Sequence, residues 1–136
     1  MPDKPKVDQD YDYEAVQDFF MPDVRVLHYV LIKNDKIVAL RVREDHNPNI
    51  FNDAAEVWVG AKGEVKQRGA ELAARTEPVP LFVKKRGLQK YTFIGNYKVC
   101  DSVTDGDGVT SARAAMKKIH TQGVSRIVFL SVTAPA

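Results

Sequence analysis

The chain has few of the residues that usually mark a catalytic or metal site. Its 136 residues include one cysteine and three histidines, with no CxxC or HExxH motif. Cys100 has no second cysteine with which to form an intramolecular disulfide, so no oxidising compartment is implied. His28, His46 and His120 show no metal-ligand spacing. We therefore expect no metal, no other cofactor and no complete catalytic site.

Long hydrophobic segments are also absent. The longest uncharged apolar stretch, 127–136, is far shorter than the roughly 20 residues of a membrane-spanning helix. Residues 1–5 (MPDKP) lack the apolar region of a signal peptide. Apolar residues make up 44% and charged residues 28%, which is typical of a globular domain. We expect a cytoplasmic protein with no membrane partner.

The net charge of +2 is distributed unevenly. Residues 1–23 contain seven acidic and two basic residues, whereas 62–98 contain nine basic and three acidic residues. This asymmetry favours an acidic partner such as nucleic acid. A solvated surface with a mobile acidic segment explains it equally well.

β-Branched and aromatic runs separated by turn formers predict a sheet-rich α+β domain over residues 24–136. Residues 1–12 are expected to be a loose arm, and the acidic segment 1–23 as a whole partly disordered or a short helix. Hairpins separated by short helices favour a curved, mostly antiparallel sheet or half-barrel. The expected helices are 13–20, 64–75 and 110–121, and the expected strands are 24–33, 36–43, 56–59, 79–86, 90–100 and 124–133.

Two local patterns refine this fold. Asn34 and Asp35 both tolerate left-handed backbone and predict a two-residue hairpin. In the strand 90–100 the period of two places alternate residues on one face. That face consists of Tyr91, Phe93, Gly95, Tyr97 and Val99.

Basic and aromatic residues are interleaved between positions 58 and 93. Cations can neutralise phosphates while aromatic faces stack on exposed bases, so this pattern is typical of a nucleic-acid surface. Aromatic core residues beside ordinary surface cations would give the same pattern. The candidate binding residues are Trp58, Lys62, Lys66, Arg68, Arg75, Lys84, Lys85, Arg86, Tyr91 and Phe93.

Two weaker patterns point to chemistry. Glu64-Val65-Lys66 matches the E-x-K half of a metal-dependent nuclease site, with Asp53 upstream as a first metal ligand. This tripeptide begins an expected helix, whereas the chemistry needs its acids on adjacent strands. Cys100 is expected to be a buried, inert thiol rather than a nucleophile.

The order of motifs from residue 58 to 99 resembles the SRA-like domains of the PUA-like superfamily, which bind modified DNA in modification-dependent restriction systems. The matching segments are 59–65 (VGAKGEV), 68–72 (RGAEL), 79–83 (VPLFV) and 91–99 (YTFIGNYKV). The resemblance implies a curved β-barrel whose concave face and loops bind DNA and receive a flipped base, with Gly95 permitting sheet curvature. The candidate pocket loop comprises Asp45, His46, Asn47, Asn49, Phe51, Asn52 and Asp53. The acidic segment 1–23 is not part of the family's pattern, and the nuclease domain of restriction proteins has no counterpart in these 136 residues.

These observations lead to a stand-alone nucleic-acid-binding module as the main hypothesis, with DNA favoured over RNA. One alternative is a regulatory factor that engages a protein partner through residues 1–23 and exposed aromatics. Another is a small metal-dependent nuclease. A further hypothesis is that the acidic segment covers the basic face and inhibits binding.

Overall fold

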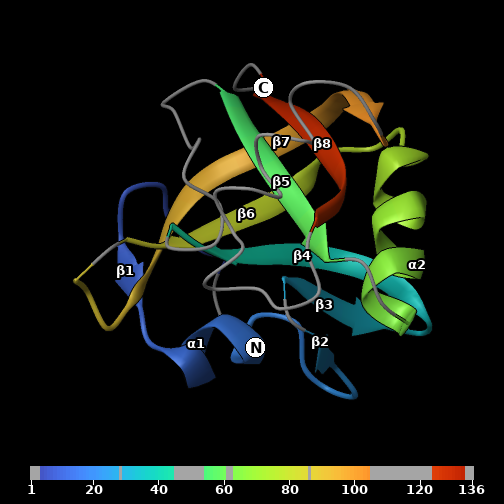
Figure 1. Ribbon diagram of the computed structural model, residues 1–136. Helices are drawn as coiled ribbons and strands as arrows, with labels where there is room; N and C mark the ends of the chain where they lie inside the picture. The colour runs from blue at the N-terminus through green and yellow to red at the C-terminus, as the bar shows by residue number, and fades with distance from the viewer. Residues whose placement is uncertain are drawn as a thin grey trace.

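A computed structural model describes residues 4–27, 29–44, 54–60, 63–85, 87–104 and 124–133. These residues form an open eight-stranded sheet in the order β2-β3-β4-β6-β7-β8-β5, with β1 paired to β7 (Figure 1). The strands are β1 Asp10–Tyr11, β2 Arg25–Leu27, β3 Val30–Lys33, β4 Lys36–Arg43, β5 Ala54–Gly60, β6 Val79–Lys84, β7 Tyr91–Val103 and β8 Val124–Val132. The helices are α1 Tyr13–Asp18 and α2 Gly63–Ala73.

Every pair of neighbouring strands in this part of the chain is antiparallel except β4 and β6, which are parallel. The expected α+β class with a curved, mostly antiparallel sheet is confirmed. The parallel pair arises because the chain leaves β4 and returns to β6 through β5 and α2. The carboxyl ends of β4 and β6 therefore lie next to each other at the same end of these two strands.

The β3–β4 hairpin agrees with its prediction. Asn34 and Asp35 have φ angles of 52° and 60°, and Lys33 pairs with Lys36 across the two-residue turn. Both central residues therefore adopt the left-handed conformation that a type I′ hairpin requires. The sequence 36–43 forms β4 with the predicted bounds.

The prediction of one long strand over 24–33 is wrong. The chain reverses between Leu27 and Val30, and these two residues pair with each other. The segment is thus a second tight hairpin, β2–β3. β-Branched and aromatic residues continue through both strands and the turn between them. The sequence pattern therefore does not indicate where the first strand ends.

Strand β7 bends at Gly95, whose φ angle is 120°. The pairing with β6 shifts there, because Gly95 faces Leu81 while Phe93 faces Phe82. Such a bulge is a position where glycine relieves the steric cost of a positive φ angle. It also overturns the single predicted face, because Tyr91 and Phe93 pack into one hydrophobic cluster and Tyr97 into another.

The two faces of the sheet carry separate cores. One cluster is covered by α2 and includes Leu72, which is fully buried. The other is covered by α1, from which Val16 is also fully buried among Leu31, Phe82 and Phe93. Burial of a valine side chain contributes roughly 1.5–3 kcal/mol, so α1 is an integral part of the fold.

The expectation of a loose arm over 1–12 is wrong for residues 8–11. Asp8 N–H donates to the Phe93 carbonyl and Phe93 N–H donates to the Gln9 carbonyl. β1 therefore extends the sheet along the first half of β7, while β8 pairs with the second half from Tyr97 to Val103. The acidic segment is in this way attached to the sheet.

Two further predictions concern a third helix and the absence of a membrane-spanning segment, and they can be compared only with the residues that the structure describes. The predicted helix over 110–121 lies outside them. Neither α1 nor α2 is long and apolar enough to cross a membrane, as far as the described residues extend.

Candidate nucleic-acid interface

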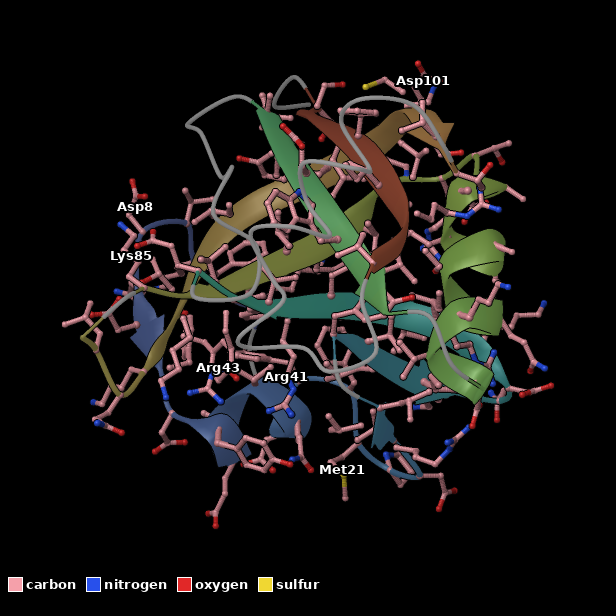
Figure 2. The ribbon with its side chains drawn as sticks, viewed as in Figure 1. Asp8, Met21, Arg41, Arg43, Lys85 and Asp101 are labelled. Carbon is pink, nitrogen blue, oxygen red and sulfur yellow. The ribbon has the colours of Figure 1, made fainter. Side chains whose placement is uncertain are left out.

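Cations gather where β4 and β6 end. Arg43 is the cross-strand partner of Lys84, and Arg41 is the partner of Phe82. Side chains alternate along each strand, and Phe82 belongs to the cluster beneath α1, so Arg41, Arg43 and Lys84 share that face. Figure 2 shows the labelled Arg41 and Arg43 side chains on the side of the sheet that α1 covers.

Arg41 lies between two aromatic rings. Its guanidinium carbon is 4.5 Å from the centroid of the Tyr13 ring and 5.6 Å from that of the Tyr91 ring. Tyr13 comes from α1 and is 48% exposed, whereas Tyr91 begins β7 and is 6% exposed. Both distances fall within the range of a cation–π interaction, so the rings hold the guanidinium in place.

We call Arg41, Arg43, Lys84 and Lys85 with Tyr13 and Tyr91 the basic end. Lys84 is half-buried, and both Arg43 and Lys85 are exposed. Two of the candidates from the sequence, Lys84 and Tyr91, are cross-strand partners here, and Lys85 follows Lys84 in the chain. The guanidinium of Arg41 lies beside two aromatic rings, and Arg43 and Lys84 lie further along the same face.

Arg68, another candidate from the sequence, forms ion pairs within the fold instead of facing solvent. It is 8% exposed and forms ion pairs with Asp35 at 2.7 Å, with Glu64 at 3.1 Å and with Glu71. Arg25 of β2 donates two further hydrogen bonds to Glu64. These bonds attach α2 to the β3–β4 turn and to β2, so the Arg68 guanidinium is already neutralised by carboxylates.

The pKa of Glu64 reflects this arrangement. Hydrogen bonds from Arg25, opposed by desolvation and reinforced by Arg68, lower the pKa of the carboxyl from 4.5 to about 2. Glu64 is therefore held as a carboxylate between two guanidinium groups. The E-x-K reading needs this carboxylate as a metal ligand, and Asp53 lies outside the described residues. Within those residues no group of three acidic, histidine or cysteine side chains is placed to hold a metal ion.

Arg75 also has a structural environment. Its guanidinium donates to the carbonyl groups of Ile37, Glu77 and Pro78, at 2.6, 3.1 and 3.1 Å. These contacts fix the connection from α2 to β6. Glu71, one turn earlier on α2, accepts instead from Arg68 and from the Ile37 N–H.

The remaining described candidates are dispersed. Phe93 is buried in the cluster beneath α1, and Lys66 is exposed on α2. Trp58 is half-buried on β5, packs beside Val124 and Ile127, and its indole donates to Glu56. The structure thus divides the predicted surface among separate elements, and β5 lies apart from β4 and β6 in the sheet order.

Other candidates lie outside the described residues. They are Lys62, Arg86 and the whole pocket loop of Asp45, His46, Asn47, Asn49, Phe51, Asn52 and Asp53. This loop follows Arg43 and Glu44 directly in the chain, so it departs from the basic end. Cys100 contradicts its expected burial: the side chain is exposed, and Sγ donates to the Phe129 carbonyl at 3.3 Å.

Tyr13, Arg41 and Arg43 were missed as candidates from the sequence. One signal was present, because Arg41 and Arg43 are two residues apart on a strand and must share a face. Their proximity to Lys84 depends on the parallel pairing of β4 with β6, and Tyr13 reaches them only through the packing of α1. Neither contact has a local sequence signature.

Acidic side chains of the N-terminal segment are engaged within the fold. Asp10 accepts a hydrogen bond from the Thr92 hydroxyl at 2.7 Å. Asp12 caps α1 by accepting from the Ala15 N–H at 2.9 Å. Their negative charge at these positions thus has a structural reason that needs no protein partner.

Comparison with protein-family models, curated proteins and solved structures finds no match for this chain. The resemblance to SRA-like domains stays a prediction that rests on residues 58–99.

Proposed function

We propose that this chain is a nucleic-acid-binding module that contacts the phosphate backbone at the basic end. The observation that carries the proposal is the pairing of Arg43 with Lys84 on adjacent parallel strands. This pairing concentrates positive charge at the ends of β4 and β6, and Lys85 follows directly in the chain. A phosphate backbone is attracted to such a local cluster of cations.

Aromatic rings at the same place favour nucleic acid over a small anion. Tyr13 is nearly half exposed and lies against Arg41, so a base can approach its ring while the cations contact phosphates. DNA is the preferred partner because of the resemblance to SRA-like domains. In that reading the loop 45–53, which follows Arg43, receives a modified or flipped base.

The direct test is a titration of the intact chain with fluorescent single- and double-stranded DNA and RNA. Each probe is used with and without modified cytosine, at two salt concentrations and with Mg²⁺. Binding in the micromolar range or tighter that weakens steeply with salt supports the module. A preference for modified DNA supports the SRA-like reading, and cleavage of the probe supports the nuclease alternative. Absence of binding to every probe at low salt contradicts the proposal.

A further inference from the structure

We propose that Arg41 binds a backbone phosphate through its two terminal nitrogens and that Tyr13 positions it for this contact. The acidic N-terminal segment then completes the interface instead of inhibiting it. This inference rests on the proposed function and deepens it, because it assigns a phosphate subsite to residues that the sequence did not single out.

The hydrogen bonds of the other arginines provide the first argument. Arg25, Arg68 and Arg75 each donate to carboxylate or carbonyl oxygens, and Arg126 donates to the Ser102 hydroxyl. In contrast, the buried Nε of Arg41 has no hydrogen-bond partner among the described residues. The guanidinium contacts the rings of Tyr13 and Tyr91 instead.

A cation–π contact leaves the hydrogen-bond donors of a guanidinium available. A cation–π contact uses the flat face of the guanidinium, whereas its N–H groups lie in the plane and point away from the rings. The two terminal nitrogens form a fork that matches two oxygens of a phosphate. Because Tyr13 and Tyr91 already restrict the side chain, less conformational entropy is lost when this fork binds an anion.

Position provides the second argument. Arg41 precedes Arg43 by two residues on β4 and shares its face, and Arg43 lies beside Lys84. The three cations therefore form a row that runs from the ring of Tyr13 to the end of β6. A phosphate backbone that contacts Arg43 and Lys84 has Arg41 as its next positive neighbour.

The placement of Tyr13 is fixed by its own element. Asp12 caps α1, Val16 is fully buried beneath the sheet, and β1 is paired to β7 through Asp10 and Tyr11. An inhibitory arm would have to leave the protein when nucleic acid binds, at the cost of this burial. A segment with these contacts is instead expected to stay in place and to form one side of the binding site.

The experiment measures affinity for the DNA probe that the intact chain binds best, over a range of salt concentrations. Tyr13→Ala is expected to weaken binding roughly 3- to 10-fold, the size of a cation–π contact, while Tyr13→Phe keeps the ring and stays within about 2-fold. Tyr13→Ala also reduces the slope of log affinity against log salt by about one, because Arg41 no longer neutralises a phosphate. Arg41→Lys retains the charge but loses the fork, so it weakens binding roughly 5-fold or more.

The control is Met21→Ala, which shortens another side chain of the same segment. The Met21 residue is 54% exposed, and its truncation is expected to leave both the affinity and the salt slope unchanged. Denaturant unfolding of each variant checks that it is folded. If Arg43→Glu weakens binding while Tyr13→Ala and Arg41→Lys equal the intact chain, the Arg41 subsite is wrong and the proposed function stands. Tighter binding by Tyr13→Ala overturns it in favour of inhibition by the segment. If the intact chain binds no probe, both proposals fail.

Discussion

Arg43 at the end of β4 and Lys84 at the end of β6 are direct neighbours across a parallel pair of strands. They are far apart in the sequence and meet because the chain passes through β5 and α2 before β6 begins. Two cations in this position concentrate positive charge where both strands end. This relationship therefore links the topology of the sheet to the proposed contact with a phosphate backbone.

Arg68 is expected to support stability and not binding. Arg68→Ala removes the hydrogen bonds to Asp35, Glu64 and Glu71, so the free energy of unfolding should fall by about 1–3 kcal/mol. Denaturant unfolding measures this loss, with the exposed Lys66→Ala as the control on the same helix. Affinity of the folded variant for DNA should stay within about 2-fold of the intact chain, because Arg68 adds no phosphate contact. A large loss of affinity with unchanged stability would show that Arg68 contacts the ligand.

Glu64 makes part of the stability depend on pH. Its pKa is lowered in the folded chain to about 2 from 4.5, chiefly by hydrogen bonds from Arg25. The folded state therefore favours the carboxylate, and this contribution is complete above pH 4.5 and lost as the pH falls towards 2. Glu64→Gln should be less stable than the intact chain at pH 7, and the difference should shrink between pH 4.5 and 2.

The measurement is the urea midpoint of both chains at several pH values. Glu14→Gln, an exposed residue in the first turn of α1, is the matched control. A difference between the intact chain and Glu64→Gln that does not change from pH 7 to pH 3 would show that the arginine contacts do not stabilise the carboxylate.

Gly69 allows α2 to approach β5 closely. A Cβ atom at this position would lie 2.5 Å from Cγ1 of Val59, and both residues are buried. Gly69→Ala should therefore destabilise the fold by roughly 1–3 kcal/mol, although alanine is the better helix former. Thermal or urea unfolding tests this, with Gln67→Ala on the exposed face as the control. The double variant Gly69→Ala with Val59→Ala should recover part of the loss, and equal stability of Gly69→Ala and the intact chain would refute the close approach.

Local chemistry made part of the fold predictable. Asn34 and Asp35 mark their turn because few residues adopt positive φ angles, and the apolar runs at β4 and β8 have clear ends. The reversal after Leu27 was missed because the sequence LHYV contains no turn former. The two faces of β7 were missed because a bulge at Gly95 shifts the period of two.

The candidate site was predictable only in part for a related reason. Lys84 and Lys85 stand out by charge, but charge alone does not separate them from Arg68 and Arg75, whose partners come from the β3–β4 hairpin or the residues after α2. Arg41 contacts Tyr13, which precedes it by 28 residues in sequence and reaches it across the packing of α1. Such contacts follow from tertiary structure, which a single sequence does not encode as a local pattern.

The central claim is the location of binding at the ends of β4 and β6. The most direct test compares two double variants of equal net charge. The first combines Arg43→Glu and Lys84→Glu, and the second combines Lys36→Glu and Lys66→Glu. Lys36 begins β4 at its opposite end and Lys66 lies exposed on α2. The first double variant should reduce DNA affinity about 100-fold or more and lower the salt slope by about two, while the second has an effect of roughly 3-fold or less. Equal loss of affinity in both double variants would contradict a defined site and attribute binding to overall charge.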